Sequence, residues 1–588
     1  MTDTTERFVD SADGTRIAVF EQGNPDGPTV VLVHGWPDSH VLWDSVVPLL
    51  SERFRVIRYD NRGTGKSTAP KHHSRYTMAR FADDFAAVTA AVNPGAPVHV
   101  LAHDWGSVGV WEYLARPGAA DVVASFTSVS GPSSDHINRF IVDGLKRPYR
   151  PRRFVHGLGQ LARLSYMGAF STPVLAPAAV RIAFARGGMR RRLLKDGIAP
   201  EAIHHSESFV GDAVNGVKVY RANFFHGLRH ARPDHRVDVP VQLIVNTRDP
   251  YVRPYAYADI PNWVPRLWRR DLVAGHWSPM SHPGPLARAV TEFVDHLGGA
   301  PAGRELARAE VGVERAPFGD QLVSVTGAGS GIGRATALAF AALGAEIVVS
   351  DISEGAAAAT VAEITAGGGT AHAYRLDVAD AEAVNRFAEQ VCTAHGVPDV
   401  LVNNAGVGHA GLFLDTPADQ YDRVLDINFG GVVNCCRAFG TRMVERGTGG
   451  HIVNVASMAA YSPTQVMNAY ATSKAAVFMF SDCLRAELDP AGIGLTTVCP
   501  GVIDTNIIDG TRFDVPTHKQ AGVEPLRAQI KKGFALRRYG PEKVAKAIVS
   551  AVQKNKPIRP VTPEAYLVYG VAHALPQVMR STARTNLG

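Results

Sequence analysis

The sequence predicts an α/β protein with two large domains, each built on a mostly parallel, doubly wound sheet. Apolar runs of strand length recur between helix-like segments in both halves, among them TVVLVH, FRVIRYD and PVHVLAHD, then LVSVTGAG, AEIVVSD and GHIVNVAS. Because these runs are continuous rather than alternating, the strands are predicted to be covered on both faces, as in parallel sheets. Each half also carries its own glycine-bearing turn directly after a strand, LAHDWGS in the first and TGAGSGIG in the second.

Length and composition agree with two such domains. The 588 residues are 46% hydrophobic and 20% charged, which leaves ample apolar material for a core in each half. The start MTDTTERFVD lacks the features of a secretory signal, the chain has no uninterrupted run of about 18 apolar residues, and its five cysteines lack a metal-site spacing. We therefore expect a cytoplasmic protein without a transmembrane helix, a disulfide framework or a bound metal.

The domain boundary is predicted from a change in composition. Residues 298–317, GGAPAGRELARAEVGVERAP, are rich in Gly, Ala, Pro and charge and have no strand-like core pattern, so they are expected to form a linker. The first domain then spans 1–297 and the second spans 318–588. Within the first domain the strand–helix alternation stops from about 132 to 238, where arginine-rich, helix-like sequence predicts a helical cap over the active site.

The first turn places a carboxylate where a nucleophile is expected. In AHDWG, Ala102 and Gly106 are small enough to let Asp104 project from a sharp strand-to-helix bend, the geometry that G-x-S-x-G gives to serine. A carboxylate that attacks an sp3 carbon forms an alkyl ester, and water must then attack the carbonyl carbon of Asp104 to release the product. This chemistry suits epoxides and haloalkanes rather than ordinary esters.

Partners for Asp104 follow in the order nucleophile, acid, histidine. Asp249 comes after a strand in NTRDPYV, and His276 follows in AGHWSPM. His276 is expected to activate the hydrolytic water, and Asp249 is expected to orient the imidazole. Upstream, HGWP follows the strand TVVLV, so the backbone N–H groups of Trp36 and Trp105 are predicted to form an oxyanion hole.

These motifs resemble the soluble epoxide hydrolase branch of the α/β-hydrolases over Val31 to His282. By that resemblance two cap tyrosines donate to the epoxide oxygen, and Tyr166 in SYMGAFSTP and Tyr220 in VYRANF are the candidates. Haloalkane dehalogenases share much of the pattern and stay an alternative. An epoxide opens to an alkoxide that needs an acid, whereas a halide leaves as an anion that needs donors to cradle it.

The second turn has the features of a dinucleotide-binding loop. LVSVTGAGSGIGRATALAF predicts a strand, a glycine-rich turn and a helix whose first N–H groups approach a pyrophosphate. The loop positions expected to contact the cofactor are Gly327, Ser330, Gly331, Ile332 and Gly333. Asp351 closes the next strand, where its carboxylate would accept hydrogen bonds from the ribose hydroxyls and repel a 2′-phosphate. NAD is therefore predicted in preference to NADP.

The remainder of the second half resembles the short-chain dehydrogenase/reductase family over about 318–510, on the strings LDV, NNAG, YATSK and PGVIDT. The resemblance implies four catalytic residues, Asn428, Ser457, Tyr470 and Lys474, with Tyr470 exchanging the alcohol proton. Lys474 lies one helical turn from Tyr470 and is expected to lower its pKa. The resemblance also implies further cofactor contacts, namely Asp377, Val378, Asn404, Ala405, Gly406, Tyr470, Lys474, Pro500, Gly501 and Thr505.

The order of the two halves resembles a fusion of epoxide hydrolase and short-chain dehydrogenase known from mycobacteria and their relatives, which implies a lipophilic or fatty-acyl substrate. Epoxide hydrolysis gives a vicinal diol, and a secondary alcohol is what the second site would oxidise. Sequential action on one lipid is therefore a hypothesis. A protein in which one half is a silent scaffold is the other alternative.

Surface features suggest partners. The formal net charge is +6, and the basic excess is concentrated in the predicted cap, including KRPYRPRR and RRR. Together with the apolar tail EAYLVYGVAHALP, this charge suggests peripheral contact with the inner membrane surface. We find no nucleic-acid-binding motif and expect no nucleic-acid partner. The family resemblance implies a homo-oligomer formed through the dehydrogenase domain.

Overall fold

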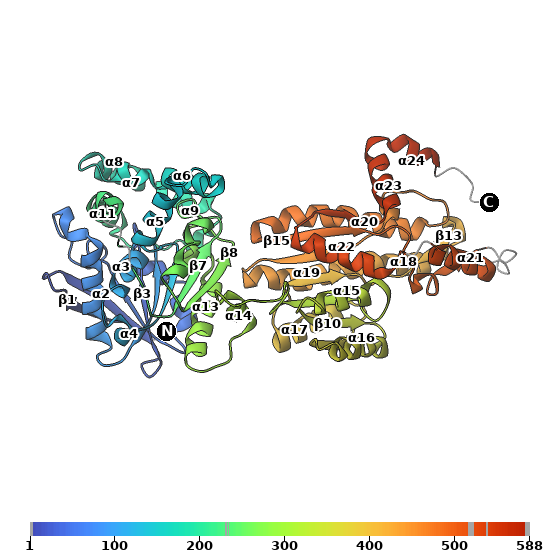
Figure 1. Ribbon diagram of the computed structural model, residues 1–588, viewed down its shortest axis with the longest axis horizontal. Helices are drawn as coiled ribbons and strands as arrows, with labels where there is room; N and C mark the ends of the chain where they lie inside the picture. Colours follow the sequence, from blue (N-terminus) through green and yellow to red (C-terminus); the bar gives the residue numbers. More distant parts are fainter. Residues whose placement is uncertain (1–3, 230–231, 233–234, 516–522, 537–538, 583–588) are drawn as a thin grey trace. The chain divides into compact units, whose positions relative to one another are not determined.

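The computed structural model divides the chain into two compact units, 1–313 and 314–588. It describes residues 4–229, 232, 235–515, 523–536 and 539–582, so short parts of the predicted cap and of the C-terminal region lie outside the described residues. Figure 1 shows both units as sheets flanked by helices. Each unit is considered by itself below.

The first unit is built on an eight-stranded sheet in the order β1-β2-β4-β3-β5-β6-β7-β8. Strand β2 pairs antiparallel with β1 and with β4, and all other neighbours are parallel. The strands are β1 (Thr5–Asp10), β2 (Arg16–Gly23), β3 (Thr29–Val33), β4 (Arg55–Tyr59), β5 (Val98–His103), β6 (Val123–Val129), β7 (Val241–Asn246) and β8 (Leu267–Leu272).

Helices cover both faces of this sheet. Val31 and Val33 of β3 face a core that includes Phe85 and Trp111, whereas Val30 and Leu32 face an opposite core. Alternate side chains of one strand are buried on both sides, which explains the continuous apolar runs in the sequence. The covering helices are α1 (Val47–Leu50), α2 (Met78–Val92), α3 (Asp104–Leu114), α4 (Ala119–Val122), α12 (Ser278–Ser281) and α13 (Pro283–Leu297).

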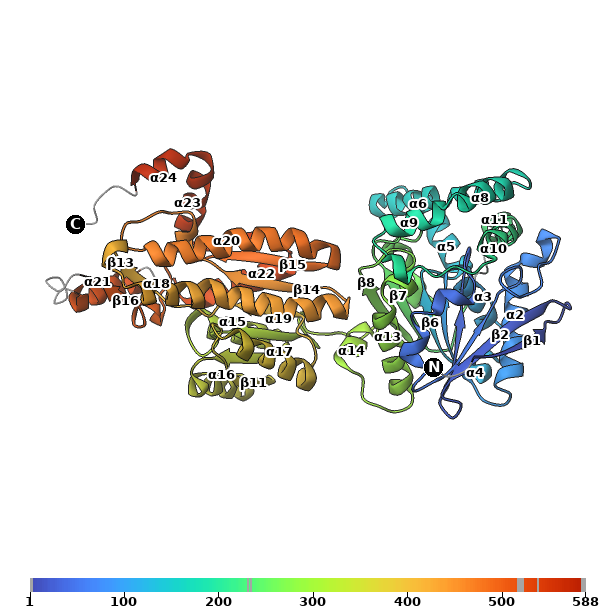
Figure 2. The ribbon, with the colours of Figure 1, turned by 180° about the vertical axis from the view of Figure 1, so that it is seen from behind.

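Between β6 and β7, where the sequence predicts a cap, the described residues form seven inserted α-helices. Figure 2 shows most of them grouped on one side of the first sheet. They are α5 (Ser134–Leu145), α6 (Pro151–Leu164), α7 (Tyr166–Phe170), α8 (Leu175–Ala185), α9 (Gly188–Lys195), α10 (Phe209–Gly216) and α11 (Lys218–Arg229). In the described residues no single helix is long and apolar enough to cross a membrane, while one pair bent by 98°, Pro151–Phe170 with Leu175–Ala185, qualifies on length and composition alone.

The segment expected to be a linker contains one short helix, α14 (Arg304–Ala309). Its Leu306 and Ala309 are buried together with Trp268 of β8 and Phe293 of α13. The first part of the segment 298–317 is therefore packed on the first unit, because these two apolar side chains cover an otherwise open end of the core.

The second unit is built on a seven-stranded, all-parallel sheet in the order β11-β10-β9-β12-β14-β15-β17, with a separate parallel pair, β13 and β16. The fold class predicted for both halves is confirmed. The strands are β9 (Leu322–Thr326), β10 (Glu346–Asp351), β11 (Ala371–Arg375), β12 (Val400–Asn403), β13 (His409–Gly411), β14 (Gly450–Val455), β15 (Ile493–Cys499), β16 (Arg512–Asp514) and β17 (Ile558–Pro560).

Two layers of helix sandwich this sheet. Helices α15, α16 and α22 share one core with Val323 and Val325, and helices α17, α19 and α20 share the other with Leu322 and Leu401. The helices are α15 (Gly331–Ala341), α16 (Glu354–Ala366), α17 (Ala381–His395), α18 (Ala418–Leu425), α19 (Gly431–Arg446), α20 (Asn468–Leu488), α21 (Val523–Leu536), α22 (Pro541–Gln553), α23 (Pro563–Ala574) and α24 (Pro576–Thr582).

The candidate residues of both units follow the carboxyl ends of parallel strands. Asp104 follows β5, Asp249 follows β7 and His276 follows β8, while Asp351 ends β10 and Ser457 lies just after β14. In open parallel sheets this edge is where ligands bind. The fold therefore brings residues far apart in the sequence to one edge in each unit.

Candidate active sites

Asp104 stands on a sharp turn between β5 and α3. It has a φ of +51°, a left-handed conformation that is strained for a residue with a side chain. A Cβ on Gly106 would lie 2.1 Å from the His34 carbonyl oxygen, and a Cβ on Gly131 would lie 2.3 Å from the Asp104 carbonyl oxygen. These two glycines allow the close backbone approach that holds the Asp104 carboxylate at the edge of the sheet.

The structure brings Asp104, His276 and Asp249 into one line. His276 Nε2 lies 3.5 Å from Asp104 Oδ2, and His276 Nδ1 lies 2.8 Å from Asp249 Oδ2. The second oxygen of Asp249 accepts hydrogen bonds from the backbone N–H groups of Tyr251 at 2.7 Å and Val252 at 3.1 Å. Asp249 is thus fixed by the backbone and in turn fixes the imidazole ring, which points its other nitrogen at Asp104.

The protonation of these three groups is coupled. Burial by itself lowers the pKa of His276, but the charges of Asp249 and Asp104 outweigh burial and raise this pKa to about 10. Burial by itself raises the pKa values of Asp104 and Asp249, and the hydrogen bonds and charge of His276 outweigh it, so both lie below their usual range. The arrangement favours an imidazolium between two carboxylates, and His276 becomes a base only when one of those charges is removed.

The backbone donors predicted for an oxyanion hole lie against the Asp104 carboxylate. The Trp36 N–H donates to Asp104 Oδ1 at 2.9 Å, and the Trp105 N–H also donates to this carboxylate. An oxyanion that forms when water attacks the Asp104 carbonyl carbon would meet these same donors. His34 is buried beside them, with its ring nitrogens engaged by the Gly35 carbonyl oxygen and the Asn61 N–H, so it is structural.

The cap supplies Tyr166 from α7 and Tyr220 from α11. Their rings lie 5.8 Å apart, their side chains share a hydrogen bond, and the Tyr220 ring lies 5.3 Å from that of Trp105. Burial raises the pKa of both phenols far above its ordinary value, and the Asp104 charge adds to the rise. Both hydroxyls are therefore protonated at neutral pH, and both are close enough to Asp104 to sense its charge.

Three further residues of this site were not predicted from the sequence. The Tyr251 ring lies 4.9 Å from that of His276 and 5.3 Å from that of Tyr166, which adds a third phenol. Asp38 accepts a hydrogen bond from Trp277 Nε1 at 3.1 Å, and burial, with the Asp104 charge, raises its pKa to about 7. All three flank predicted motifs directly, so a search of the neighbouring positions for polar and aromatic residues would have found them.

In the second unit the glycine-rich loop connects β9 to α15. Gly327 and Gly331 have φ of +61° and +53°, which favours glycine. A Cβ on Gly327 would lie 2.7 Å from Ala405 Cα, and a Cβ on Gly333 would lie 2.2 Å from the Gly327 carbonyl oxygen. The loop therefore packs closely on its surroundings and leaves the start of α15, with its unpaired N–H groups, at the carboxyl edge of the sheet.

Residues of the loop and of the neighbouring strand end complete the candidate cofactor site. Ser330 precedes the first turn of α15, and Ile332 packs against the core beneath the loop. Asp351 Oδ2 accepts a hydrogen bond from the Gly329 N–H at 2.9 Å, and its Oδ1 accepts one from the Ser353 N–H at 3.0 Å. The Asp351 carboxylate is thus fixed beside the glycine loop.

Asn404 and Ala405 join the same loop to β12. The Asn404 side-chain amide donates to the carbonyl oxygens of Thr326 and Gly327 at 3.1 Å each, and the Ala405 N–H donates to Thr326 Oγ1 at 3.1 Å. A Cβ on Gly406 would lie 3.0 Å from Asn428 Oδ1, so the chain passes close to the catalytic candidates here.

The remaining cofactor candidates lie on two other loops, after β11 and after β15. Asp377 accepts a hydrogen bond from the Ala379 N–H at 3.0 Å, and Val378 is buried in the core. The Pro500 carbonyl oxygen accepts one from the Met458 N–H at 2.8 Å. A Cβ on Gly501 would collide with Thr562, and Thr505 lies near Gly331. The structure thus brings the loops after β9, β10, β12 and β15 together, and it places Asp377 and Val378 at the loop after β11.

The four catalytic candidates are adjacent. Tyr470 is hydrogen-bonded to Ser457, and the Lys474 ammonium lies 5.9 Å from the centre of the Tyr470 ring. Lys474 Nζ donates to the Val455 carbonyl oxygen at 3.0 Å. Buried Asn428, on a π-helical turn, accepts a hydrogen bond from the Val407 N–H at 2.8 Å. A π-turn inside a helix is often found at functional sites.

Burial sets the direction of the pKa shifts of Tyr470 and Lys474. It raises the pKa of Tyr470, and the hydrogen bond with Ser457 opposes that rise without reversing it. Burial also lowers the pKa of Lys474 to about 8, because it disfavours the charged ammonium. The expected lowering of the Tyr470 pKa by Lys474 stays a prediction.

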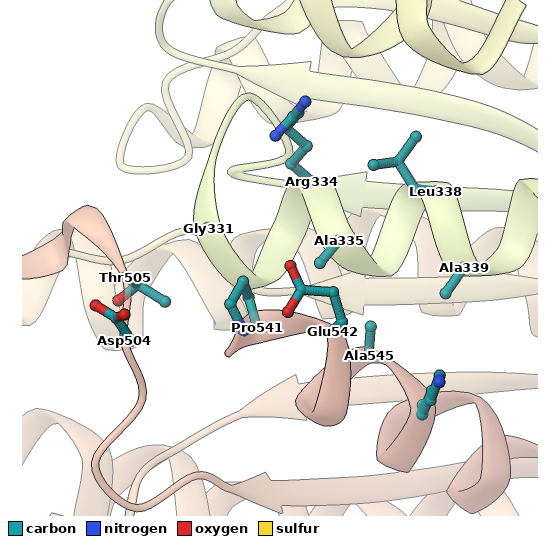
Figure 3. Close-up of a pocket in the computed structure, with 11 residues that line it drawn as sticks. Gly331, Arg334, Ala335, Leu338, Ala339, Asp504, Thr505, Pro541, Glu542 and Ala545 are labelled. Atoms are coloured by element: carbon teal, nitrogen blue, oxygen red, sulfur yellow. The ribbon is translucent and has the colours of Figure 1, made fainter. Parts of the chain in front are cut away.

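A pocket of about 420 Å³ lies beside the cofactor loop (Figure 3). It is formed mainly by one side of α15 and the start of α22, and only Gly331 and Thr505 among its lining residues are cofactor candidates. Arg334, which also lines it, is ion-paired with Glu363 of α16. The pocket is thus a neighbour of the candidate site and does not include Tyr470.

Comparison with known proteins assigns the class of each half. Residues 28–283 match the alpha/beta hydrolase fold family, and residues 321–514 match the short chain dehydrogenase family. The chain is also 64% identical over 586 residues, 99% of both chains, to the protein named probable oxidoreductase EphD in Mycobacterium bovis and Mycobacterium tuberculosis.

The chain therefore belongs to the family of these mycobacterial proteins, in which an α/β-hydrolase domain is followed by a short-chain dehydrogenase domain. Family membership implies NAD(P) as cofactor of the second domain. A C alpha-dehydrogenase of Sphingobium is 34% identical over 40% of this chain and 79% of its own. A short-chain dehydrogenase of Burkholderia phymatum, solved in complex with NAD, is 29% identical over 46% of this chain and 98% of its own, with a TM-score of 0.41.

Proposed function

We propose that the first unit hydrolyses an epoxide to a vicinal diol and that the second interconverts an alcohol and a carbonyl with NAD. One observation carries the first half of this proposal. The Asp104 carboxylate lies between a histidine held by Asp249 and two protonated cap tyrosines, of which Tyr220 is buried and Tyr166 half-buried. This set supplies a nucleophile, a base and acids for opening an epoxide ring.

In the first step an Asp104 carboxylate oxygen attacks one epoxide carbon. The carbon–oxygen bond of the ring breaks, and the oxygen leaving that carbon takes a proton from Tyr166 or Tyr220, whose high pKa makes each a donor rather than a phenolate. The product is an alkyl ester on Asp104 with a neighbouring hydroxyl group.

In the second step the ester is hydrolysed. Esterification removes the Asp104 charge, which is one of the causes that raise the pKa of His276, so the imidazole becomes a better base at this point. His276 gives its resting proton, through solvent, to the phenolate that the first step leaves. The neutral imidazole then takes a proton from water, and the hydroxide attacks the Asp104 carbonyl carbon. The oxyanion is stabilised by the N–H groups of Trp36 and Trp105. Its collapse releases the diol and restores the carboxylate.

The haloalkane alternative needs N–H groups that cradle a departing halide. Two indoles adjoin the site, but Trp36 Nε1 donates to the Ala213 carbonyl oxygen at 2.9 Å and the Trp105 side chain is hydrogen-bonded to Tyr220. The engaged indoles and the two phenols favour the epoxide. Replacing both Tyr166 and Tyr220 by Phe separates the alternatives, because it lowers epoxide turnover by about 10²–10⁴-fold and spares halide release.

In the second unit the residues present fit a nicotinamide dinucleotide. Gly327 and Gly333 let the loop before and into α15 pack closely on Ala405 and on its own backbone, and Asp351 stands at the adjacent strand end. NAD, when bound, exchanges a hydride with the alcohol carbon. Asp351 favours NAD over NADP because a carboxylate repels a 2′-phosphate, and the nearby cation Arg334 is ion-paired with Glu363.

Side chains of the second unit transfer the proton of the substrate hydroxyl group. Ser457 and Tyr470 are hydrogen-bonded to each other and are positioned to hold one substrate oxygen between them. In reduction the Tyr470 phenol gives its proton to the carbonyl oxygen and becomes a phenolate, and in oxidation that phenolate takes the proton of the alcohol. Lys474, charged below its pKa of about 8, stabilises the phenolate that forms, and Asn428 supports the backbone turn beside them.

We further propose a lipophilic substrate that both sites use in sequence, and contact of the cap with a membrane surface. The cap exposes apolar side chains beside arginines, with Val174 and Leu175 exposed by 76% and 73%. Such a surface binds anionic lipid through charge and apolar area together. Sedimentation with vesicles tests the membrane contact. We expect the protein to bind anionic vesicles and salt to weaken that binding. A protein that binds neither anionic nor neutral vesicles would contradict the proposed contact.

The direct test of the proposed function incubates the protein with a long-chain epoxy fatty acid and NAD and follows product masses over time. Gain of one water followed by loss of two hydrogens is the expected result. Gain of water alone supports the hydrolase and contradicts sequential oxidation of this diol. If the epoxide gains no water and haloalkanes release halide, the first unit is a haloalkane dehalogenase instead of an epoxide hydrolase.

A further inference from the structure

One cluster of three potential metal ligands, a glutamate and two histidines, lies away from both candidate sites. Among the residues that the structure describes, Glu346, His372 and His395 bring one ligand atom each to within 4.8 Å of one another. Glu346 is the first residue of β10, His372 lies on the edge strand β11, and His395 ends α17. The three residues are far apart in the sequence, so no short metal-binding motif predicts them.

The distances within the cluster match the edges of a metal coordination shell. Glu346 Oε1 lies 2.8 Å from His372 Nε2 and 3.7 Å from His395 Nδ1. Zinc binds imidazole nitrogen and carboxylate oxygen at about 2.0–2.2 Å, so two ligands of a tetrahedral ion are about 3.4 Å apart. The two measured separations lie on either side of this value, and small side-chain rotations would equalise them.

Ring packing and hydrogen bonding orient the two histidines. Each ring turns one nitrogen toward Glu346 Oε1. The rings are stacked with centroids 3.9 Å apart and planes 22° from parallel, so they must tilt toward each other for both lone pairs to meet at one ion. His395 Nε2 lies 2.7 Å from the Tyr374 hydroxyl. When Nε2–H donates to that oxygen, Nδ1 keeps its lone pair toward Glu346, which is the outer-shell arrangement usual for metal-bound histidine.

The cluster is also accessible. The side chains of Glu346, His372 and His395 are exposed by 21%, 33% and 13%, so an ion can enter and a water molecule can take the fourth position. Two neutral imidazoles and one carboxylate form a donor set that suits zinc better than magnesium or calcium, which prefer oxygen ligands.

We propose that Glu346, His372 and His395 form a structural zinc site. Because Glu346 begins β10 and Asp351 ends it, the site lies at the opposite end of the sheet from the cofactor loop. The ion would link the edge strand β11 and the end of α17 to β10. It stabilises the second unit and takes no part in hydride transfer.

Zinc binding to the tag-free full chain, measured by competition with a chromophoric chelator, tests this proposal. We expect the wild type to bind one zinc equivalent that His372→Gln and His395→Gln both lack. Tyr374→Phe should weaken binding about tenfold, since it removes the outer-shell partner. His573→Gln, which alters an exposed histidine of the same unit, is the matched control and should bind like the wild type.

Cobalt absorption and the unfolding temperature provide two further measurements. Cobalt in place of zinc should give the visible absorption of a tetrahedral site in the wild type and in His573→Gln, and none in His372→Gln. Zinc should raise the unfolding temperature of the wild type without changing alcohol oxidation. Equal zinc binding by the wild type and by folded His372→Gln and His395→Gln, judged by circular dichroism, would overturn the proposal, and so would a wild type that binds no zinc.

Discussion

At the scale of single residues, the chemistry of the first unit depends on the charges around His276. The imidazole lies between Asp104 and Asp249, and these two carboxylates together raise its pKa to about 10. A histidine that is protonated at rest is a poor base, yet the same contact makes it responsive to esterification of Asp104. The order of the two chemical steps thus follows from the electrostatics of the site.

The first prediction concerns His276→Gln. This variant should still open the epoxide through Asp104, but it lacks the base for the second step and should accumulate the alkyl ester. Intact-protein mass spectrometry should show the mass of the protein plus one substrate. The double variant with Asp104→Ala is the control and should show no adduct. Steady diol production by His276→Gln at the wild-type rate would contradict the assigned role.

The second prediction concerns stability and pH. His276 has a folded pKa of about 10 and an unfolded pKa of about 6.5, so its contribution to the free energy of unfolding is fully present below about pH 6.5 and is lost as the pH rises toward 10. The difference in unfolding temperature between wild type and His276→Gln should therefore shrink over that interval. Calorimetric scans of both proteins measure it, and a constant difference would show that the two carboxylates do not hold the proton.

At the scale of elements, both sites depend on glycines that let the chain turn where a Cβ would collide. At Gly333 a Cβ would lie 2.2 Å from the Gly327 carbonyl oxygen and 2.5 Å from Asn404 Nδ2. At Gly355, in α16, a Cβ would meet no heavy atom within 4 Å. The two glycines belong to the same unit and differ in whether packing forbids a side chain.

This difference gives the third prediction. Gly333→Ala should destabilise the second unit by about 1–3 kcal/mol, since the backbone must move to relieve the overlap, and should weaken NAD binding. Gly355→Ala should change stability by less than about 1 kcal/mol and leave NAD binding intact. Thermal unfolding and fluorescence titration with NADH compare the two variants. Equal NADH affinity in both would mean that the close packing of the loop is not needed for the cofactor.

Much of the arrangement of elements follows from sequence pattern, because continuous apolar runs and turn residues are local signals. The pairing of β2 with β1 and β4 in antiparallel fashion was not predicted, since it depends on long-range register. The same holds for α14, whose two buried residues matter only once β8 and α13 are beside them.

In the candidate sites, too, local sequence signals predict some residues, and only the fold brings in the others. Asp104, His276, Tyr470 and Lys474 occur in motifs whose spacing fixes their place on a turn or helix face. The cluster around Glu346 carries no such signal. Asp38 directly follows the HGWP motif, but its role depends on the fold, which brings its carboxyl to Trp277, more than two hundred positions later.

At the scale of the whole molecule, the chain consists of two units that each contain a complete set of candidate catalytic residues. No catalytic candidate of one unit is drawn from the other. Each set of candidate residues is therefore contained in its own unit. This arrangement permits each activity to be removed separately.

The fourth prediction uses this independence. Tyr470→Phe should lower NAD reduction with a suitable alcohol by about 10²–10⁴-fold and leave diol formation unchanged. Asp104→Ala should abolish diol formation and leave alcohol oxidation unchanged. Product analysis with an epoxide and separately with its diol, for both variants, checks all four outcomes. Loss of both activities in either folded variant would contradict two independent sites.

The central claim is that Asp104 attacks the substrate and is itself attacked by water. A single turnover of the wild-type protein, in excess over a long-chain epoxy fatty acid and in ¹⁸O-labelled water, tests it most directly. We expect the first diol molecules to carry no label, because their new oxygen comes from Asp104, and a peptide containing Asp104 to become labelled. Labelled diol in the first turnover, with an unlabelled Asp104 peptide, would show direct attack of water on the epoxide and exclude Asp104 as the nucleophile.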